Sequence, residues 1–462
     1  MPSLRRAALD QFAERLRPDY ERGLRELVEI PTISSDPAHR SDMRLGAAAA
    51  ARLIKAAGGR ARIVRTAGHP VVLGDFPAPA GAPTVVLYNH LDVQPAAREA
   101  EGWRTEPFRL LRRGDHYYGR GTTDDKGPAL AALLGVQAAR EAGVPIGVRL
   151  LWEMEEEIGS PSLEPVLRTL AGRGRPHSVV VSDAAWLDRR RPTSIAGLRG
   201  FVGFRFVLDT AEGDAHSGDV GGAARNPLAE LMQLSADIHD ARTGRVKVPG
   251  FYAGVVPLRA RERADFRRSG FSLPAYRRDN HLRRLRTSDP VEVLERIWAR
   301  PTFEVHGLVG GYTGPGIKSA VPGHAELKAS CRLVPRQDPE TIARLVKAFV
   351  RKRHPDVVVH LEGGALPYEG SSEGPVADAV REAMSFAFGR TPAFVRDGGT
   401  IGAVVSMERI LRSPIAFLNL SLPEHGYHAP NENFDWGQAA GGIAAFARYL
   451  EVAAETRRTA RA

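Results

Sequence analysis

The stretch "LYNHLDVQP", residues Leu87–Pro95, places His90 and Asp92 where an apolar run, "TVVLYN", gives way to a proline-bounded turn. An unbroken apolar run of this kind is typical of a strand that is buried on both faces of a sheet. A histidine and an aspartate two residues apart also occur in solvated turns, so this pair alone does not identify a functional site. The function has to be inferred from the rest of the chain.

Helix and strand patterns alternate around this stretch. The segment "KGPALAALLGVQAAREAG" predicts a helix with Pro128 near its first turn, and "GVRLLWEM" and "HSVVVSD" predict further buried strands. Apolar positions from Leu4 to Glu29 recur at helical spacing, and we expect Pro18 to interrupt them. The alternation predicts an α/β fold with a mostly parallel sheet covered by helices.

The pattern changes in the middle of the chain. "FVGFRFVLDT" and "AELKASCRLVP" alternate apolar and polar residues, which is typical of a sheet with one solvated face, and a predicted helix follows each. Beyond them, "IAFLNLSL" and a helix from Trp436 to Val452 return to the α/β pattern. We therefore expect one domain in two pieces, 1–194 and 368–462, with a smaller α+β domain, 195–367, inserted between them.

Composition narrows the function classes. The 462 residues are enough for about two or three domains, and no apolar run approaches the roughly 20 residues of a membrane span. The first 20 residues form an amphipathic pattern without the apolar core of a secretion signal, so we expect a cytoplasmic protein without membrane insertion. Cys331 is the single cysteine, which excludes an internal disulfide and a cysteine-rich zinc site. A metal would need histidine and carboxylate ligands.

The net charge of +10 raises the question of a nucleic-acid partner. Most arginines are mixed with acidic residues on predicted helices, as on solvated helical faces. The stretch "RRDNHLRRLRTSD", from Arg277 to Asp289, is more one-sided, but no aromatic stacking surface or nucleic-acid motif accompanies it. We expect no nucleic-acid partner, and the role of this basic stretch stays open.

Four more clusters of ligand-type residues occupy predicted strand ends, where open α/β sheets bind their ligands. They are "GRGTTDDKGP" with Asp124 and Asp125, "WEMEEEIGS", "VVVSDAAW" with Asp183, and "PEHGYHAPNENF" with His425 and His428. Each cluster alone is compatible with a helix cap, a charged turn or a loop histidine. Together they supply the ligands of a two-metal hydrolytic site without cysteine.

The chain resembles the M20 metallopeptidase family, and within it the cytosolic dipeptidase and carnosinase branch. The motifs that carry the resemblance follow the family's order: "HLDVQP", "GWRTEPF", "YGRGTTDDKGP", "EEEIGSPSL", "SDAAW", "GLRG", "DAHSGDVGG", "RLVP", "GGTI" and "HAPNE". The resemblance implies a zinc-exopeptidase-like catalytic domain in the two outer pieces and an inserted lid and dimerisation domain.

The resemblance also implies the metal ligands. His90 and Asp183 would hold the first of two divalent metal ions, Glu157 and His428 the second, and Asp124 would bridge both. Zn²⁺ is the first choice for the metal, with Mn²⁺ and Co²⁺ as alternatives. A cis peptide bond between Asp124 and Asp125 is implied as well.

The resemblance also implies roles for two further acidic residues. Asp92 would orient His90 by accepting the proton of its other ring nitrogen. Glu156 would be the general base that takes a proton from the metal-bridged water and delivers it to the leaving amine. The triple glutamate leaves the register ambiguous, but the family's paired acids lie immediately before "IGS", so Glu155 is expected to be a bystander.

In the inserted domain and beyond, four residues resemble substrate contacts. His216 would reach from one subunit's lid into the other's active site and stabilise the oxyanion, which implies a homodimer formed through the lid. Arg332 would bind the substrate's free carboxylate, and Ser319 and Thr400 would contact the substrate. Two residues depart from the pattern: Met154 replaces a common glycine and could tighten the pocket wall, and Thr400 replaces a serine.

These observations predict a two-metal hydrolase that cleaves the amide bond of a dipeptide or a similar substrate with a free carboxylate. An N-acyl-amino-acid deacylase or desuccinylase with the same metals is the alternative, because specificity lies in lid contacts that the sequence does not reveal. A non-catalytic or nucleic-acid-binding protein on the same fold is more remote, since no ligand and no base is missing.

Overall fold

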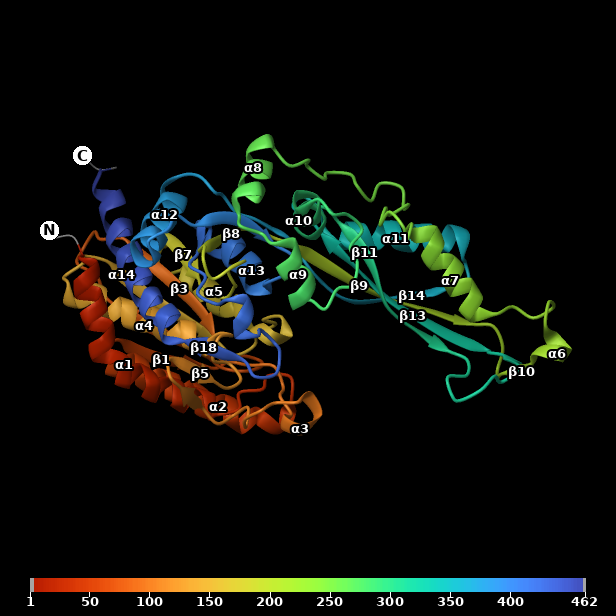
Figure 1. The fold of residues 1–462 in the computed structure, drawn as a ribbon, viewed down its shortest axis with the longest axis horizontal. Helices are drawn as coiled ribbons and strands as arrows, with labels where there is room; N and C mark the ends of the chain where they lie inside the picture. Colours follow the sequence, from red (N-terminus) through yellow and green to blue (C-terminus); the bar gives the residue numbers. More distant parts are fainter. Residues whose placement is uncertain (1–3, 460–462) are drawn as a thin grey trace.

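The computed structural model describes residues 4–459, and its largest sheet has six strands (Figure 1). The strands β6, β3, β7 and β17 are mutually parallel, whereas the β1–β2 and β2–β6 pairs are antiparallel. The predicted α/β class is confirmed. In spatial order the strands are β1 (Arg60–Val64), β2 (Val71–Phe76), β6 (Gly147–Glu153), β3 (Thr84–His90), β7 (Ser178–Val181) and β17 (Ile415–Phe417).

Alternate side chains of β3 enter two different cores. Val85 and Leu87 pack into one hydrophobic cluster, and Val86 and Tyr88 pack into another. Removing such apolar surface from water stabilises the fold by about 1.5–3 kcal/mol per fully buried side chain. The first face is covered by α1 (Arg6–Val28), α2 (Arg40–Ala56), α4 (Lys126–Glu141), α12 (Pro375–Phe388) and α14 (Trp436–Thr459), and the second by α5 (Leu163–Ala171) and α13 (Gly402–Leu411).

The first helix corrects one expectation. Pro18 lies inside α1, and the helix continues through it to Val28. Proline removes one backbone hydrogen bond, but Phe12, Tyr20 and Leu24 are buried on the same helix and hold both halves against the core. Within residues 4–459, no helix combines the length and the apolar character needed to cross a bilayer.

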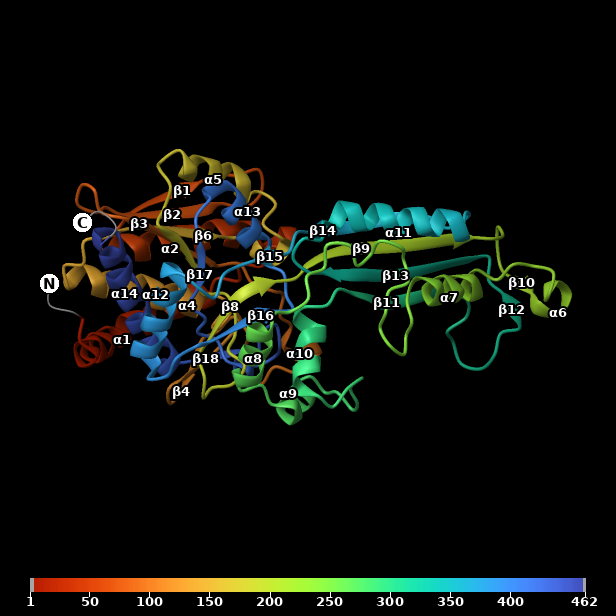
Figure 2. The same ribbon diagram turned by 90° about the horizontal axis from the view of Figure 1, so that it is seen from above.

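A second, four-stranded antiparallel sheet projects away from the first (Figures 1 and 2). Phe204, Ala329 and Cys331 point from it into a separate core with two helices, while the intervening residues face outward, as the alternating sequence predicts. We call this unit the lid. It consists of β11 (Thr302–Gly310), β13 (His324–Leu333), β9 (Gly200–Asp209) and β14 (Val358–Ala365), with α7 (Pro227–Ile238) and α11 (Pro339–Arg353).

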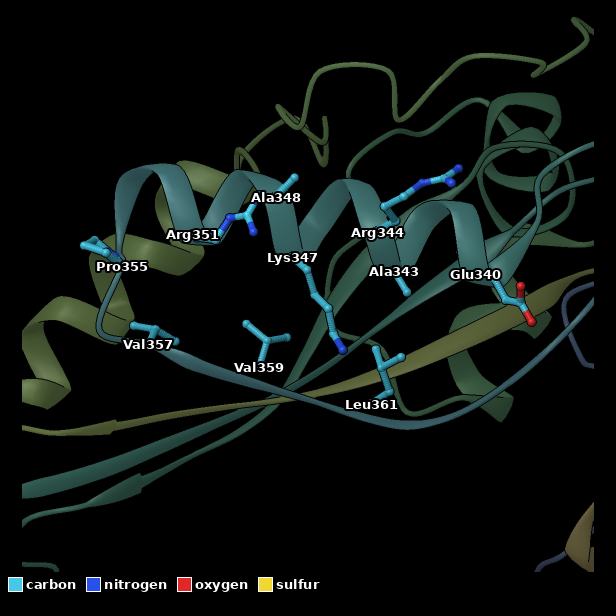
Figure 3. Close-up of a pocket in the computed structure, with 10 residues that line it drawn as sticks. All are labelled: Glu340, Ala343, Arg344, Lys347, Ala348, Arg351, Pro355, Val357, Val359 and Leu361. Atoms are coloured by element: carbon cyan, nitrogen blue, oxygen red, sulfur yellow. The ribbon is translucent and has the colours of Figure 1, made fainter.

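The far end of the lid, which we call the lid tip, carries β10 (Ala215–His216), α6 (Ser217–Val220) and β12 (Ala320–Val321) (Figure 1). On another part of the lid, α11 and β14 enclose a groove lined by Ala343, Lys347, Val357 and Val359 (Figure 3). β14 forms an edge of the lid sheet.

Other parts of the inserted segment pack against the first domain. Phe266, Leu294 and Trp298 share a hydrophobic cluster with Met407 of α13. Strand β8 (Thr193–Leu198) pairs with β15 (Tyr368–Glu369) and β16 (Ala393–Asp397), across the expected junctions. The domain limits at 194/195 and 367/368 stay a prediction.

The remaining elements are α8 (Ala260–Arg268), α9 (Leu273–Asp279), α10 (Pro290–Trp298), α3 (Arg98–Glu101), β4 (Leu111–Arg113), β5 (His116–Tyr118), β18 (Asn433–Asp435), and the 3₁₀ turns η1 (Pro37–His39), η2 (Glu156–Ile158) and η3 (Pro423–His425).

Candidate metal centre

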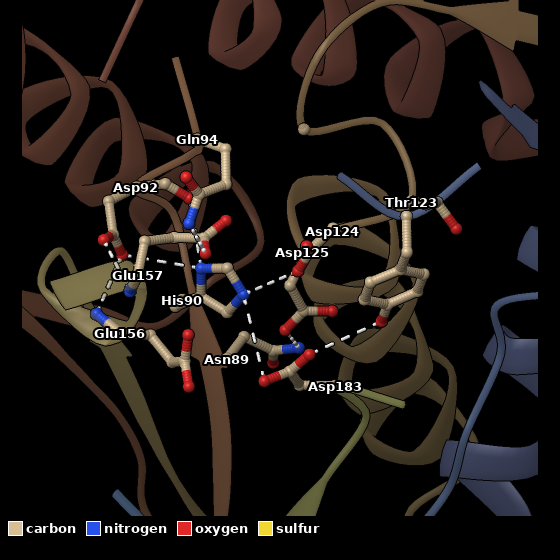
Figure 4. Close-up of polar contacts among 12 residues, drawn as sticks. Asn89, His90, Asp92, Gln94, Thr123, Asp124, Asp125, Glu156, Glu157 and Asp183 are labelled. Carbon is tan, nitrogen blue, oxygen red and sulfur yellow. Dashed lines mark hydrogen bonds and ion pairs between the residues drawn. The ribbon is translucent and has the colours of Figure 1, made fainter. Parts of the chain in front are cut away.

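Five residues proposed as metal ligands meet at the carboxyl-terminal edge of the main sheet. His90 is the last residue of β3, and Asp183 follows the adjacent parallel strand β7. Glu157 lies in η2, just after β6, and Asp124 precedes α4. His428 arrives from the loop after η3. Because the carboxyl ends of parallel strands share one edge, loops that are distant in sequence converge there (Figure 4).

The ligand atoms form two groups that share one residue. In the first group, His90 Nε2 lies 2.9 Å from Asp124 Oδ1 and 3.9 Å from Asp183 Oδ2. In the second, His428 Nε2 lies 2.9 Å from Asp124 Oδ2 and 3.2 Å from Glu157 Oε2. The atoms of each group lie within 4.8 Å of one another. Asp124 therefore presents one carboxylate oxygen to each group, and its peptide bond to Asp125 is cis, as expected.

The electrostatics of this cluster favour cations. Burial raises the pKa of Asp183 to about 7, and the nearby charges of Asp124 and Glu157 oppose its ionisation further. Hydrogen bonds to Asp124 and Glu157 raise the pKa of His428 to about 10. Imidazole nitrogens and carboxylate oxygens are ligands that Zn²⁺, Mn²⁺ and Co²⁺ all accept. The donor set and the crowding of negative charge fit two divalent cations.

Asp92 contacts both the histidine and the acidic turn. Its Oδ1 lies 3.4 Å from His90 Nδ1, and its backbone oxygen lies 3.1 Å from the same nitrogen. Its two carboxylate oxygens also accept the backbone N–H groups of Glu156 and Glu157, at 3.2 and 3.1 Å. The sequence predicted the contact of Asp92 with His90 but not its hydrogen bonds to the backbone of Glu156 and Glu157. Asp92 thus positions His90 relative to the acidic turn.

The three consecutive glutamates have different surroundings. Burial raises the pKa of Glu156 well above its usual range, and the charge of Asp183 adds to this effect (Figure 4). Glu157 accepts a 2.7 Å hydrogen bond from Gln94 in addition to its contact with His428. Glu155 turns elsewhere, because its carboxylate accepts the backbone N–H groups of His69 and Ser162. These two hydrogen bonds hold Glu155 away from the ligand groups, and the roles of Glu156 and Glu157 stay predictions.

A buried residue that the sequence did not single out supports the turn that carries Asp124. Glu432 is fully buried and accepts the backbone N–H groups of Gly121, Thr123 and Asp124, at 2.9, 2.9 and 3.2 Å. It also accepts a 2.9 Å hydrogen bond from Arg120. The position of Glu432 in the motif "HAPNE" could have marked it as a candidate site residue. A single sequence, however, does not show which backbone N–H groups a glutamate in a loop will accept.

Two other residues of the sequence clusters lie outside the ligand groups. His425 is buried, and its ring nitrogens contact Thr123 Oγ1 and Asp435 Oδ2, each at 3.1 Å. Met154 is fully buried in the core against Gly46 of α2, which corrects the expectation that it tightens the pocket wall. Successive residues of a strand point to opposite faces, so a position near the active strand end can face the core.

The four substrate-contact candidates form two pairs. Arg332 Nη1 donates a 3.3 Å hydrogen bond to Thr400 Oγ1 at the base of the lid. His216 and Ser319 lie together at the lid tip, where Ser217 N donates a 2.9 Å hydrogen bond to Ser319 O. The side chain of His216 is 65% exposed. Within one chain the lid tip lies far from the metal cluster (Figure 1).

The sequence matches a family of known peptidases. The model of peptidase family M20/M25/M40 matches residues 86–452. The Beta-Ala-His dipeptidase of Homo sapiens is 31% identical over 395 residues, which cover 83% of this chain and 78% of that protein. The Cys-Gly metallodipeptidase dug1 of Schizosaccharomyces pombe is 30% identical over 393 residues, which cover 82% of each.

Solved structures show the same fold. Human carnosine dipeptidase 1 superposes with a TM-score of 0.84 at 28% identity, covering 98% of this chain and 100% of that chain. The di-peptidase Dug1p of Saccharomyces cerevisiae superposes with a TM-score of 0.83 at 27% identity, covering 97% and 98%. The family match spans well over half of the chain. The chain belongs to the M20 family of metallopeptidases and is a hydrolase of peptide bonds.

Proposed function

We propose that the chain is a two-metal dipeptidase that cleaves the amide bond next to a free carboxylate. The observation that carries this proposal is the pair of three-residue groups that share Asp124. The names of the relatives, a Beta-Ala-His dipeptidase and a Cys-Gly metallodipeptidase, support a dipeptide as substrate.

His90, Asp124 and Asp183 would hold one cation, and Asp124, Glu157 and His428 the other. When bound, the cations would polarise the scissile carbonyl group and make a water molecule easier to deprotonate. Glu156 would accept the proton of that water and transfer it to the amine nitrogen as the C–N bond breaks. Burial, together with the charge of Asp183, raises the pKa of Glu156 above its usual range, which makes this carboxylate a stronger base than an exposed glutamate.

Arg332 is the proposed partner of the substrate's carboxylate. Its guanidinium donates to the neutral hydroxyl of Thr400 and forms no ion pair within 4 Å with any side chain that the structure describes. A planar guanidinium can donate two parallel hydrogen bonds to a carboxylate. Binding the substrate at this end would orient its amide bond toward the metal cluster.

We further propose a homodimer formed through the lid, in which His216 and Ser319 reach the partner's active site. The exposure of His216 and its distance from its own metal cluster support this arrangement (Figure 1). The edge strand β14, with Val358 and Leu361 about half exposed, is a surface that a second copy could cover. The cytoplasmic location stays a prediction.

The alternative within the same family is an N-acyl-amino-acid deacylase or desuccinylase, because the proposed metal ligands and base would serve another acyl group equally well. Metal analysis combined with a substrate panel distinguishes the two. We expect two divalent metal ions per chain and faster hydrolysis of dipeptides than of N-acetyl or N-succinyl amino acids. Faster cleavage of the acylated compounds would favour the deacylase. No hydrolysis of any compound by metal-loaded protein would favour the non-catalytic alternative.

A further inference from the structure

A cleft of about 900 Å³ lies on the outward face of the lid sheet, next to α10. The strands contribute Glu304, Ser330 and Arg332, whose positions alternate with residues of the lid core. The loop that carries Arg245 forms another wall. This volume lies within the range of pockets that bind small molecules.

The cleft is rich in unpaired positive charge. Arg296 and Arg300 pair with Glu292 and Glu295. The other four arginines that line the cleft form no ion pair within 4 Å in the part of the chain that the structure describes. The carboxylate among the lining residues is that of Glu304. These four are Arg199, Arg245, Arg286 and Arg332.

Like charges lie close together at the inner end of the cleft. The pKa of Arg199 is lowered to about 10 by burial and by the positive charge of Arg332. The hydroxyl of Thr400 links the two residues, since it donates to the backbone oxygen of Arg199 and accepts from the guanidinium of Arg332. Neighbouring cations with neutral partners favour binding of an anion.

The segment that begins at Thr400, the hydrogen-bond partner of Arg332, packs against the acidic turn of the metal cluster. A Cβ atom at Gly402, two residues after Thr400, would lie 3.3 Å from the backbone oxygen of Gly159. Gly159 ends the η2 turn that carries Glu156 and Glu157. A substrate held by Arg332 would therefore have its amide bond on the metal side and its carboxyl-terminal side chain in the cleft.

The basic stretch from Arg277 to Asp289 supplies one wall. The guanidinium of Arg286 donates to the backbone oxygens of Ala241 and Arg242, which ties this stretch to the loop that carries Arg245. Arg245 and Arg286 are exposed and line the cleft. Arg284, two residues before Arg286, is exposed as well but does not line it.

We propose that this cleft binds a second carboxylate, on the side chain of an acidic carboxyl-terminal residue, so that the enzyme prefers dipeptides ending in aspartate or glutamate. The inference rests on the proposed function, in which Arg332 binds the terminal carboxylate. Arg245 and Arg286 are then specificity-determining residues. The basic stretch, whose role the sequence left open, serves substrate selection.

The test compares Ala-Glu with Ala-Gln, which differ by a charge and hardly in shape. We expect kcat/KM of the metal-loaded enzyme to be at least about tenfold higher for Ala-Glu than for Ala-Gln, because the cleft arginines would form charge-assisted hydrogen bonds only with the glutamate side chain. The double variant Arg245→Gln, Arg286→Gln should bring this ratio close to one. Arg284→Gln removes the same charge from the same stretch outside the cleft, and it should retain the ratio.

The inference is overturned if the wild-type enzyme cleaves both peptides with similar kcat/KM, or if the double variant keeps the full preference. The ratio should also fall as salt is raised from about 0.05 to about 0.5 M, because the two arginines are exposed to screening. A ratio that salt leaves unchanged would contradict a charge-based preference. Failure to cleave either peptide would refute the proposed dipeptidase function instead.

Discussion

The family resemblance assigns two histidines to the active site, His90 at the end of β3 as a metal ligand and His216 at the lid tip as a catalytic residue, but their surroundings differ. His90 is fully buried, and Asp92, Asp124 and Asp183 surround its two ring nitrogens. The side chain of His216 is 65% exposed, and its Nδ1 accepts the backbone N–H of Gly218 in its own turn.

The contrast shows that one chain alone surrounds His90 with its partners but leaves the surroundings of His216 incomplete. The metal cluster lies against a doubly covered sheet, and four of its five proposed ligands have side chains that are at most 9% exposed. The fifth, His428, is 54% exposed and is oriented by its contacts with Asp124 and Glu157. Residues 215–220 and 320–321 of the lid tip belong to none of the hydrophobic clusters of the described chain. The acidic neighbour of His216 is Asp219, 3.7 Å away, and both side chains are largely exposed. If His216 takes part in the reaction, a second surface has to surround it.

The largest effect is expected at the residue that joins the two ligand groups. Asp124→Asn keeps the size of the side chain but removes the charge that both histidines contact. We expect loss of bound metal and a fall in kcat of roughly four orders of magnitude or more. Elemental analysis of the purified variant, together with its activity, measures both.

Asp378→Asn is a suitable control, because Asp378 is an exposed aspartate on α12. It should retain metal and activity. If Asp124→Asn keeps both metals and full activity, the bridging role is wrong, and the two ligand groups do not act as one centre.

The second prediction tests the register of the glutamates. Glu156→Gln removes the proposed base but not a ligand, so metal content should persist while kcat falls by roughly 10²–10⁴-fold. Glu157→Gln should instead weaken metal binding, because Glu157 contacts His428 within the second group. An equal loss of metal in both variants would show that the register is wrong.

The third prediction tests the lid tip. His216→Ala should keep its metals and lose roughly 10²–10³-fold in kcat, because the residue would contact the developing oxyanion and not the cations. The sharper measurement is complementation with Glu156→Gln. In a mixed dimer, one site combines an intact Glu156 from one subunit with an intact His216 from the other.

A random mixture of the two inactive variants should recover about one quarter of wild-type activity if subunits exchange freely. Half of the dimers are mixed, and each mixed dimer has one complete site of two. Exchange has to be verified independently, for example with two differently labelled subunits. No recovery despite proven exchange would mean that His216 acts within its own chain or not at all.

The difference between the metal cluster and the lid tip also explains which parts of the fold and of the site could be predicted from the sequence. Buried strands such as "TVVLYN" and the alternating "FVGFRFVLDT" predicted the two sheets, because strand periodicity reflects which faces are buried. The ligand residues stood at strand ends, and parallel strands bring such ends together. Each of these signals is local in the sequence.

The sequence was less informative where the outcome depended on contacts between distant segments. Pro18 does not end α1, because tertiary packing outweighs one lost hydrogen bond. Met154 faces the core, which depends on the register of one strand. Glu432 lies more than 300 residues from the turn that it supports, and its partners are backbone groups, which any sequence contains.

Glu432 therefore gives the last and smallest prediction, which asks whether the cluster depends on residues that touch no metal ligand side chain. One carboxylate oxygen accepts from Thr123 and Asp124, and the other accepts from Gly121 and Arg120. Glu432→Gln replaces one acceptor oxygen with an NH₂ group, so that donors face donors on one side of the side chain. Each buried donor left without an acceptor costs about 1–3 kcal/mol, and the turn that carries Asp124 should loosen.

We expect metal affinity to fall by about 10- to 100-fold, as for other residues that orient metal ligands, while kcat at saturating metal stays within a few fold of wild type. Competition with a chelator of known affinity measures the first quantity, and activity in excess metal measures the second. Glu424→Gln, an exposed glutamate of the neighbouring η3 turn, is the matched control and should change neither. An unchanged affinity in a folded Glu432→Gln variant would mean that the side chains around His90 and His428 hold the centre without support from the backbone of the Asp124 turn. The metal cluster would then be independent of its surroundings, and the contrast with the lid tip would lie in burial alone.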